Sequence, residues 1–176
     1  MTASPAARAD DRVPYAKPQP WGMTPDLVIP DVLTDDPLLW APVGEGVWSR
    51  PLHLNVTGGF YTHLLKVKRS GLLQRHRHSG QVHAYVLKGK WLYLEHDWVA
   101  HEGSYVFEPP GETHTLVVPD DCQDMVTLFT VFGALMYVDP QGQATGYDDV
   151  FTRIEKYRAH FEAVGLGADH VKRFMR

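Results

Sequence analysis

The histidines are the side chains whose spacing points most clearly to chemistry. Ten of the 176 residues are histidine, and six of them lie between His76 and His114. His76 and His78 are two residues apart, so an extended strand would project both imidazoles from one face. His114, which follows a Pro-Pro-Gly turn, could add a third imidazole from another strand. Three neutral imidazoles suit Fe(II), but also zinc, copper or nickel, so ligand type alone does not choose the metal.

Three further side chains are candidates for a catalytic role beside such a metal. Glu108, six residues before His114, could bind a ligand imidazole or accept a substrate proton, unless it is an exposed turn carboxylate. His83 could be a fourth ligand or an imidazole that contacts the substrate. Tyr93 is in phase with Trp91, so the two line a pocket if their face is interior, or a subunit interface if it is exterior.

Short runs of β-type residues separated by turn residues predict the scaffold that holds these side chains. The runs recur about every 8–12 residues, which is typical of an antiparallel sandwich or barrel. Strands do not alternate with helices, which counts against a Rossmann or TIM-barrel fold. The strand candidates are residues 46–56, 60–68, 82–87, 90–95, 105–107, 113–118 and 125–138.

One amphipathic helix is predicted near the C-terminus, over residues 148–164. Asp148 or Asp149 can cap its first turn, and Gly165 can end its last. Its apolar residues recur at spacings of three and four: Phe151, Ile154, Tyr157, Phe161 and Val164. We therefore divide the chain into an extended N-terminal arm (1–24), a β-barrel (25–146), and a C-terminal helix and tail packed on the barrel (147–176).

Composition and charge exclude several classes of function. With 17 basic and 21 acidic residues and no basic run, the chain has no electrostatic footprint for nucleic acid or an anionic membrane. Its most apolar run, residues 125–138, is shorter than the ~20 residues that span a bilayer and is interpreted as a buried strand. No secretory signal is recognisable, and a single cysteine, Cys122, suits a reducing compartment, so we expect a cytoplasmic protein.

The histidines, together with the glycines and proline around them, form a sequence pattern that resembles the two cupin motifs. Gly71, His76, His78 and Gly89 are similar to the first motif, and Gly103, Pro109, Gly111 and His114 match the second. In the first motif, only four residues separate Gly71 from His76, the spacing to Gly89 is one residue short, and His83 stands where a Glu is usual. The resemblance implies an all-β fold, the cupin jelly-roll barrel, with a three-histidine site.

Residues 76–118 are also similar to the 2,4'-dihydroxyacetophenone dioxygenase family of cupins, above all in the segments YLEHDW and FEPPGETH. This resemblance implies a mononuclear non-haem iron that uses O2 to cleave the bond between the ketone and hydroxymethyl carbons of a small aromatic α-hydroxyketone. The products would be 4-hydroxybenzoate and formate. In this interpretation His76, His78 and His114 hold the iron, and Glu108, His83 and Tyr93 are the candidate catalytic residues.

Other functions remain open from the sequence. The chain could be a cupin dioxygenase for a diketone or a flavonol, a zinc- or manganese-dependent isomerase, or a metal- or ligand-sensing cupin without catalysis. Cupins commonly pair through sheet edges and N-terminal arms, so we also expect a homo-oligomer, either a dimer or a tetramer.

Overall fold

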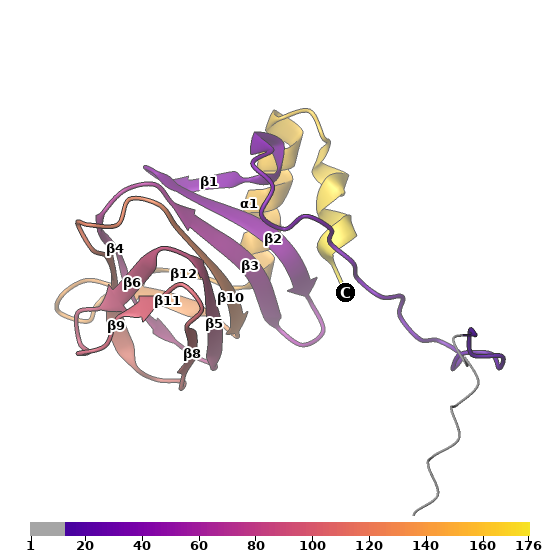
Figure 1. Cartoon of the computed structure of the whole chain (residues 1–176), viewed down its shortest axis with the longest axis horizontal. Coiled ribbons are helices and arrows are strands. Elements are labelled where there is room, and N and C mark those ends of the chain that lie inside the picture. Colours follow the sequence, from indigo (N-terminus) through magenta and orange to yellow (C-terminus); the bar gives the residue numbers. More distant parts are fainter. Residues whose placement is uncertain (1–12) are drawn as a thin grey trace, which may run out of the picture.

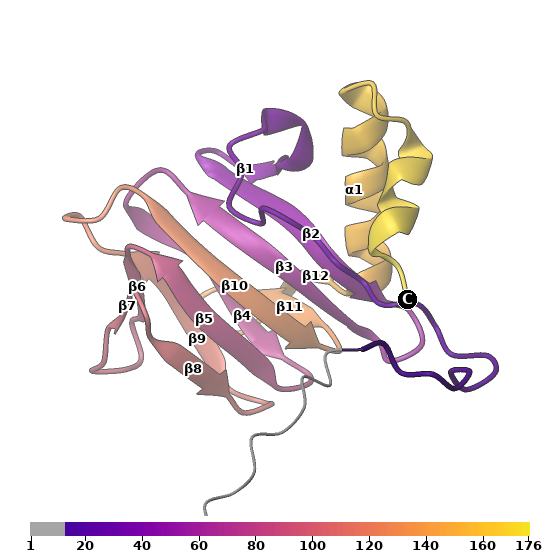
Figure 2. The same cartoon turned by 45° about the vertical axis from the view of Figure 1, so that its right-hand side comes forward.

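A computed structural model describes residues 13–176, so part of the expected N-terminal arm, residues 1–12, lies outside the described residues. Two six-stranded sheets face each other as a jelly-roll barrel, with helical segments at one side (Figures 1 and 2). All neighbouring strands are antiparallel. The prediction of an all-β jelly roll with a C-terminal helix is confirmed.

The two sheets are built from strands far apart in the sequence. The first sheet contains, in spatial order, β1 (Ala41–Gly44), β2 (Val47–Asn55), β3 (Phe60–Val67), β10 (Met125–Phe132), β5 (Val82–Lys88) and β8 (Tyr105–Glu108). The second contains β12 (Ala144–Asp148), β11 (Leu135–Val138), β4 (Gly71–His78), β9 (Thr113–Val118), β6 (Lys90–Tyr93) and β7 (Ala100–His101).

Alternation along the strands separates an inner apolar face from an outer face. In β5, Val82 and Ala84 are buried whereas Tyr85 is exposed, as expected when successive side chains point to opposite faces. In β6, Trp91 and Tyr93 are both buried in the main core. The face that carries these two aromatic rings is therefore the interior one.

The apolar run 125–138 is not one strand, and that prediction is wrong. Gly133 has a φ of +71° and turns the chain, so β10 lies in the first sheet and β11 in the second. A Cβ at this position would lie 2.4 Å from Ser79 Oγ, a side-chain atom that can move aside, so the left-handed backbone is what favours glycine in this turn. The run is long because it lines the barrel twice.

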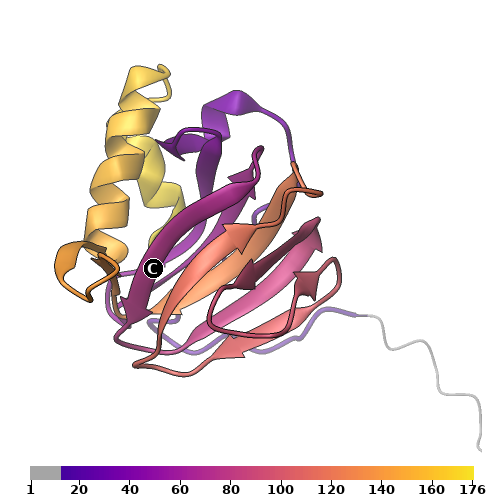
Figure 3. The same cartoon turned by 90° about the vertical axis from the view of Figure 1, so that its left-hand side faces the viewer.

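Helix α1 (Val150–Ala163) stands along one side of the barrel, as Figure 3 shows. Its N-cap is Asp149, which accepts a hydrogen bond from the backbone of Thr152 while the Thr152 hydroxyl accepts one from Asp149 N–H. Ile154, Tyr157 and Phe161 face the barrel as predicted.

Phe151 does not belong to the buried stripe of α1, and that prediction is wrong. Its side chain is 58% exposed, whereas Val150, at the first position of the helix, is buried. Neighbouring helical residues differ by about 100° in direction, so a stripe that begins at Val150 turns Phe151 outward. Arg153, three residues after Val150, is buried on the stripe instead.

The segments before β1 and after α1 close one side of the barrel. Arg50 Nη1 donates to the carbonyl oxygens of Asp31 (2.8 Å) and Val32 (2.6 Å), which ties the segment before the 3₁₀-helix η1 (Pro37–Leu39) to β2. After α1, the 3₁₀-helix η2 (Ala168–Phe174) buries Val171 and Phe174. No helix in residues 13–176 has the length and apolar character needed to cross a membrane.

Candidate metal centre

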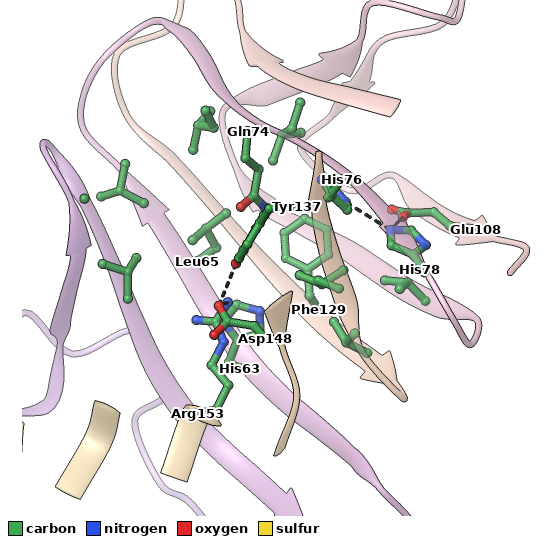
Figure 4. A pocket seen from close by; sticks show the side chains of 18 of the residues that line it. His63, Leu65, Gln74, His76, His78, Glu108, Phe129, Tyr137, Asp148 and Arg153 are labelled. Carbon is green, nitrogen blue, oxygen red and sulfur yellow. Dashed lines mark hydrogen bonds and ion pairs between the residues drawn. The ribbon is translucent and has the colours of Figure 1, made fainter. Parts of the chain in front are cut away.

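The antiparallel pairing of β4 with β9 brings the three predicted histidines together. His76 lies directly opposite His114, and His78 follows two residues later on the same face of β4. All three side chains are buried. Glu108, at the end of β8 in the opposite sheet, is also buried and points at His78 (Figure 4). Two strands of one sheet and one strand of the other thus present three imidazoles and a carboxylate to a common point.

His78 lies at the middle of this cluster. Its Nε2 atom is 3.0 Å from Nε2 of His76 and 3.0 Å from Nε2 of His114. The same atom is 3.1 Å from Oε2 of Glu108. Oε2 of Glu108 is also 3.6 Å from Nε2 of His114. Two donor atoms bound at about 2.1 Å to one metal lie no more than about 4.2 Å apart, so these spacings fit ligands of one shared metal ion.

The protonation of the histidines also fits a metal. Burial lowers the pKa of His78 to about 4 and that of His114 to about 3, and it holds the pKa of His76 well below the usual value. The imidazoles are therefore neutral near pH 7 and offer nitrogen lone pairs. Lone pairs 3.0 Å apart repel one another unless a proton or a cation lies between them, so the cluster is suited to a cation.

Glu108 and Tyr93 complete the wall of this site. Burial raises the pKa of Glu108 to about 8, and neither carboxylate oxygen makes a hydrogen bond of normal geometry within residues 13–176. Burial and the adjacent Glu108 carboxylate raise the pKa of Tyr93 well above its usual value, and the Tyr93 ring stacks on His114 at 3.6 Å between centroids. An orphaned buried carboxylate is costly unless a cation or a proton compensates it.

A second group of side chains surrounds His114, and the sequence analysis did not single it out. Glu112 Oε2 lies 3.9 Å from His114 Nδ1, and Glu112 Oε1 lies 3.0 Å from His96 Nε2. At 3.9 Å the contact with His114 is not a hydrogen bond, and His114 Nδ1 has no hydrogen-bond partner among residues 13–176. The sequence could have indicated Glu112 by its position, because it is two residues before His114.

His83 is not among the side chains of this cluster, so its role as a fourth ligand or catalytic residue stays a prediction without support from this geometry. The alternation of β5 that turns Val82 inward turns His83 outward. There its Nδ1 atom is 2.7 Å from the hydroxyl of Tyr105, and its ring lies beside Phe107. The residue at the usual Glu position of the first motif therefore faces away from the metal ligands, and Glu108 supplies the carboxylate from another strand.

A cavity of about 250 Å³ opens between the sheets next to the cluster (Figure 4). One end is lined by His76, His78, Glu108 and Tyr93, and the middle by apolar side chains that include Leu65, Phe129 and Leu135. The other end is polar and carries His63, Tyr137, Asp148 and Arg153. The cavity has room for a small organic molecule that reaches from the cluster to this polar end.

The polar end was missed in the sequence. Arg153 lies on the buried stripe of α1, where a charged residue is unusual, and this position was the available signal. The sequence does not indicate a functional role for the other three residues, because each is an ordinary polar residue in or beside a strand: Asp148, Tyr137 and His63.

The fold and the buried cluster define a cupin whose site can hold a metal ion. The chain belongs to the ChrR cupin-like family, because the model of the ChrR cupin-like domain matches residues 30–136. A comparison with curated proteins finds no match.

Solved structures support the same class. An RmlC-like cupin protein from Ralstonia eutropha JMP134 is 31% identical, with a TM-score of 0.69, over 72% of this chain and 83% of that one. An acetylacetone dioxygenase from Acinetobacter johnsonii shares the fold at 18% identity and a TM-score of 0.68, over 84% of this chain and 99% of that one.

Proposed function

We propose that this protein is a non-haem iron dioxygenase that cleaves 2,4'-dihydroxyacetophenone with O2 into 4-hydroxybenzoate and formate. The observation that carries the proposal is the cluster itself, in which three neutral imidazoles and one carboxylate converge at one end of a cavity between the sheets. Three imidazoles and a carboxylate are suitable ligands for iron. When bound, iron would supply the chemistry that activates O2 and polarises the two oxygens of the hydroxyketone.

Two further observations support a dioxygenase acting on a ketone. The segments around Glu95 and His114 are similar to the 2,4'-dihydroxyacetophenone dioxygenase family, and a solved protein with this fold is an acetylacetone dioxygenase. The reaction balances, because both oxygen atoms of O2 enter the products while the bond between the ketone and hydroxymethyl carbons breaks.

The side chains around the cluster have complementary roles in this proposal. Glu108 would accept the proton that the hydroxyketone loses, because its carboxyl group is buried beside the imidazoles that would hold the metal. Tyr93, whose hydroxyl lies beside Glu108, would hold the carboxylate in place. The apolar middle of the cavity, with Leu65 and Phe129, would bind the aromatic ring and exclude water.

Oxygen uptake tests the reaction. The protein is loaded anaerobically with Fe(II), mixed with 2,4'-dihydroxyacetophenone and exposed to O2, while oxygen, 4-hydroxybenzoate and formate are measured. We expect one O2 consumed for each molecule of both products. Iron-loaded protein that consumes no oxygen would exclude this substrate, and full activity with zinc but no iron would exclude the dioxygenase class.

Metal retention tests the ligand set separately from catalysis. His76→Ala and His114→Ala should each reduce bound iron at least tenfold, measured by metal analysis after gel filtration, because each removes a buried donor atom. His83→Ala is the matched control and should keep its iron, since His83 faces outward on β5. Unchanged iron in the first two variants would show that the ligands lie elsewhere.

Acetylacetone is a second candidate substrate for the same assay. The fold shared with an acetylacetone dioxygenase favours it, and a β-diketone also carries two oxygens that one metal can bind. The polar end of the cavity distinguishes the two candidates, because acetylacetone has no group to place there.

A further inference from the structure

Arg153 occupies the end of the cavity remote from the metal cluster. It projects from α1 between the two sheets, where its side chain lies next to His63 and Asp148 (Figure 4). The residue is only 5% exposed. Its guanidinium is charged at any physiological pH, so a full positive charge is buried beside the cavity.

This guanidinium is only partly paired. Its Nη2 atom lies 3.0 Å from Oδ2 of Asp148. The hydroxyls of Tyr61 and Tyr157 lie close enough to influence its charge, and its Cζ is 5.3 Å from the centre of the Tyr61 ring. Nevertheless, Nε and Nη1 have no hydrogen-bond partner among the residues that the structure describes. Buried N–H groups of a cation are costly when unsatisfied, so this guanidinium, which lines the cavity, is under-satisfied by the residues that the structure describes.

The charges around Arg153 do not balance. Asp148 already accepts hydrogen bonds from Tyr137 (2.6 Å), Thr152 (3.2 Å) and Lys156, in addition to its ion pair with Arg153. Burial alone would raise the pKa of Asp148, but the nearby Arg153 and Lys156 hold this pKa below its usual value. Asp148 is therefore a carboxylate. One carboxylate thus faces two cations.

His63, the other titratable group at this end, adds no charge. Burial, together with the nearby Arg153, lowers its pKa well below the usual value, and its Nδ1 atom is 2.8 Å from Ser49 Oγ. At the polar end, one carboxylate therefore pairs with the buried Arg153 and with the half-exposed Lys156, and two nitrogen atoms of Arg153 have no partner among the described residues.

We propose that Arg153 binds an acidic group on the end of the substrate remote from the metal, and so selects substrates that carry one. This inference rests on the proposed function, in which that group is the ring hydroxyl opposite the hydroxyketone. A phenol with a carbonyl group in the para position is more acidic than an ordinary phenol, because the carbonyl delocalises the negative charge of the phenolate. A guanidinium binds such an oxygen by a charge-assisted hydrogen bond.

The alternative is that Arg153 serves only to fix α1 to the barrel through Asp148. The two roles differ in one measurable respect. A purely structural arginine affects stability or overall activity equally for all substrates, whereas a recognition residue changes the preference between substrates that differ only at the remote group.

Paired substrates test this preference in the whole iron-loaded protein. 2,4'-Dihydroxyacetophenone is compared with 2-hydroxy-4'-methylacetophenone, in which a methyl group of similar size replaces the ring hydroxyl. We expect kcat/KM to favour the hydroxyl compound at least tenfold in the natural protein. In Arg153→Met we expect this preference to fall close to one. Equal kcat/KM values in the natural protein, or an unchanged preference in Arg153→Met, would overturn the inference.

Lys156→Met is the matched control. It removes the other cation that pairs with Asp148, but it leaves Arg153 in the lining of the cavity. The preference for the hydroxyl compound should therefore persist in this variant. If Lys156→Met lowers the preference as much as Arg153→Met does, the effect is one of net charge and not of a contact with Arg153.

A binding measurement separates this inference from the proposed reaction. Calorimetric titration of the natural protein with 4-hydroxyacetophenone and with 4-methylacetophenone needs no turnover and no variant. Tighter binding of the hydroxyl compound, at least tenfold, would support the inference even if neither hydroxyketone consumes oxygen. Equal affinities would overturn it even if the reaction is confirmed, and would do so whether or not Arg153→Met folds.

Discussion

Burial keeps the histidines that line the cavity neutral. At the metal end it keeps His76, His78 and His114 neutral, and at the polar end it keeps His63 neutral. Arg153 remains charged in the same interior because its proton cannot be lost at physiological pH. One cavity therefore presents nitrogen lone pairs at one end and N–H donors at the other.

The buried neutral state of His63 predicts a pH dependence of stability. Because burial lowers its pKa in the folded protein, the unfolded chain binds a proton that the folded chain excludes. Stability is therefore fully present above about pH 6.5, the usual histidine pKa, and falls as the pH drops below it. We expect His63→Asn to reduce this slope by about 1.4 kcal/mol per pH unit in metal-free protein.

Urea unfolding at a series of pH values measures this slope. Ser49→Ala is the control, because it removes the hydrogen bond to His63 but keeps the imidazole. It should lower stability at every pH and leave the slope unchanged. An identical slope in His63→Asn and the natural protein would show that His63 takes up its proton equally in both states.

At the residue scale, the sequence was informative about the metal ligands and silent about the polar end. The i, i+2 spacing of His76 and His78 has a direct structural meaning on a strand, which is why that pair could be found. Glu108 was found by its distance from His114. The burial of Arg153 depends on Asp148, Tyr61 and the cavity, which come from other elements, so no local pattern could predict it.

At the scale of elements, the turns decide which strands meet. Gly89, between β5 and β6, has a φ of +72°, and a Cβ there would lie 2.4 Å from the carbonyl oxygen of Asp124. Backbone atoms cannot move aside as the end of a flexible side chain can. The hairpin that carries Tyr93 toward the site thus depends on a glycine at this position.

A pair of glycine substitutions separates crowding from backbone strain. Gly142 also has a positive φ, +83°, but a Cβ there would meet nothing within 4 Å. We expect Gly142→Ala to lower the free energy of unfolding by about 1 kcal/mol, from the left-handed backbone alone. Gly89→Ala should lower it by at least about 1–2 kcal/mol more, because the added methyl group also clashes. Equal losses in urea unfolding would contradict the crowding argument.

Most strands with alternating apolar residues were predictable, and the exceptions have physical reasons. Four strands were not among the candidates. β1 and β7 have only four and two residues, β4 is largely polar, and most of β12 is exposed. The sequence predicts one strand over residues 125–138, because β10 and β11 bury the same kind of apolar side chain. Only the turn at Gly133, which depends on tertiary packing against Ser79, separates β10 from β11.

At the scale of the whole molecule, two exposed apolar surfaces have no partner within residues 13–176. The N-terminal segment leads away from the barrel and exposes Tyr15 and Trp21 (Figure 1). The outer face of β5 and β8 exposes Tyr85, Tyr105 and Phe107, and β8 lies at the edge of its sheet. Exposed aromatic patches and free sheet edges are typical of association surfaces.

We propose that the protein is a homo-oligomer that uses these surfaces. Size-exclusion chromatography with light scattering should give two or four times the mass of one chain. Removing residues 1–24 should shift the mass toward one chain, because the exposed aromatic residues of the segment are lost. A full-length protein that is monomeric at micromolar concentration would contradict the proposal.

The class of fold was predictable at this scale, whereas the position of α1 against the barrel was not. Regularly spaced strands and the two glycine-framed histidine motifs pointed to a jelly roll. The packing of α1 depends on where its first turn is capped. A cap at Asp149, in place of Asp148, decides which side chains face the barrel, and a local pattern did not distinguish the two neighbouring aspartates.

The two ends of the cavity have very different origins in the chain. The metal end is assembled from β4, β8 and β9, so any change in their register would disturb it. At the polar end, by contrast, Asp148, Arg153 and Lys156 fall within nine consecutive residues, at the junction of β12 and α1. Under the proposed function, a few substitutions in this short segment would change which molecules the cavity accepts, while the residues of the metal cluster stay the same.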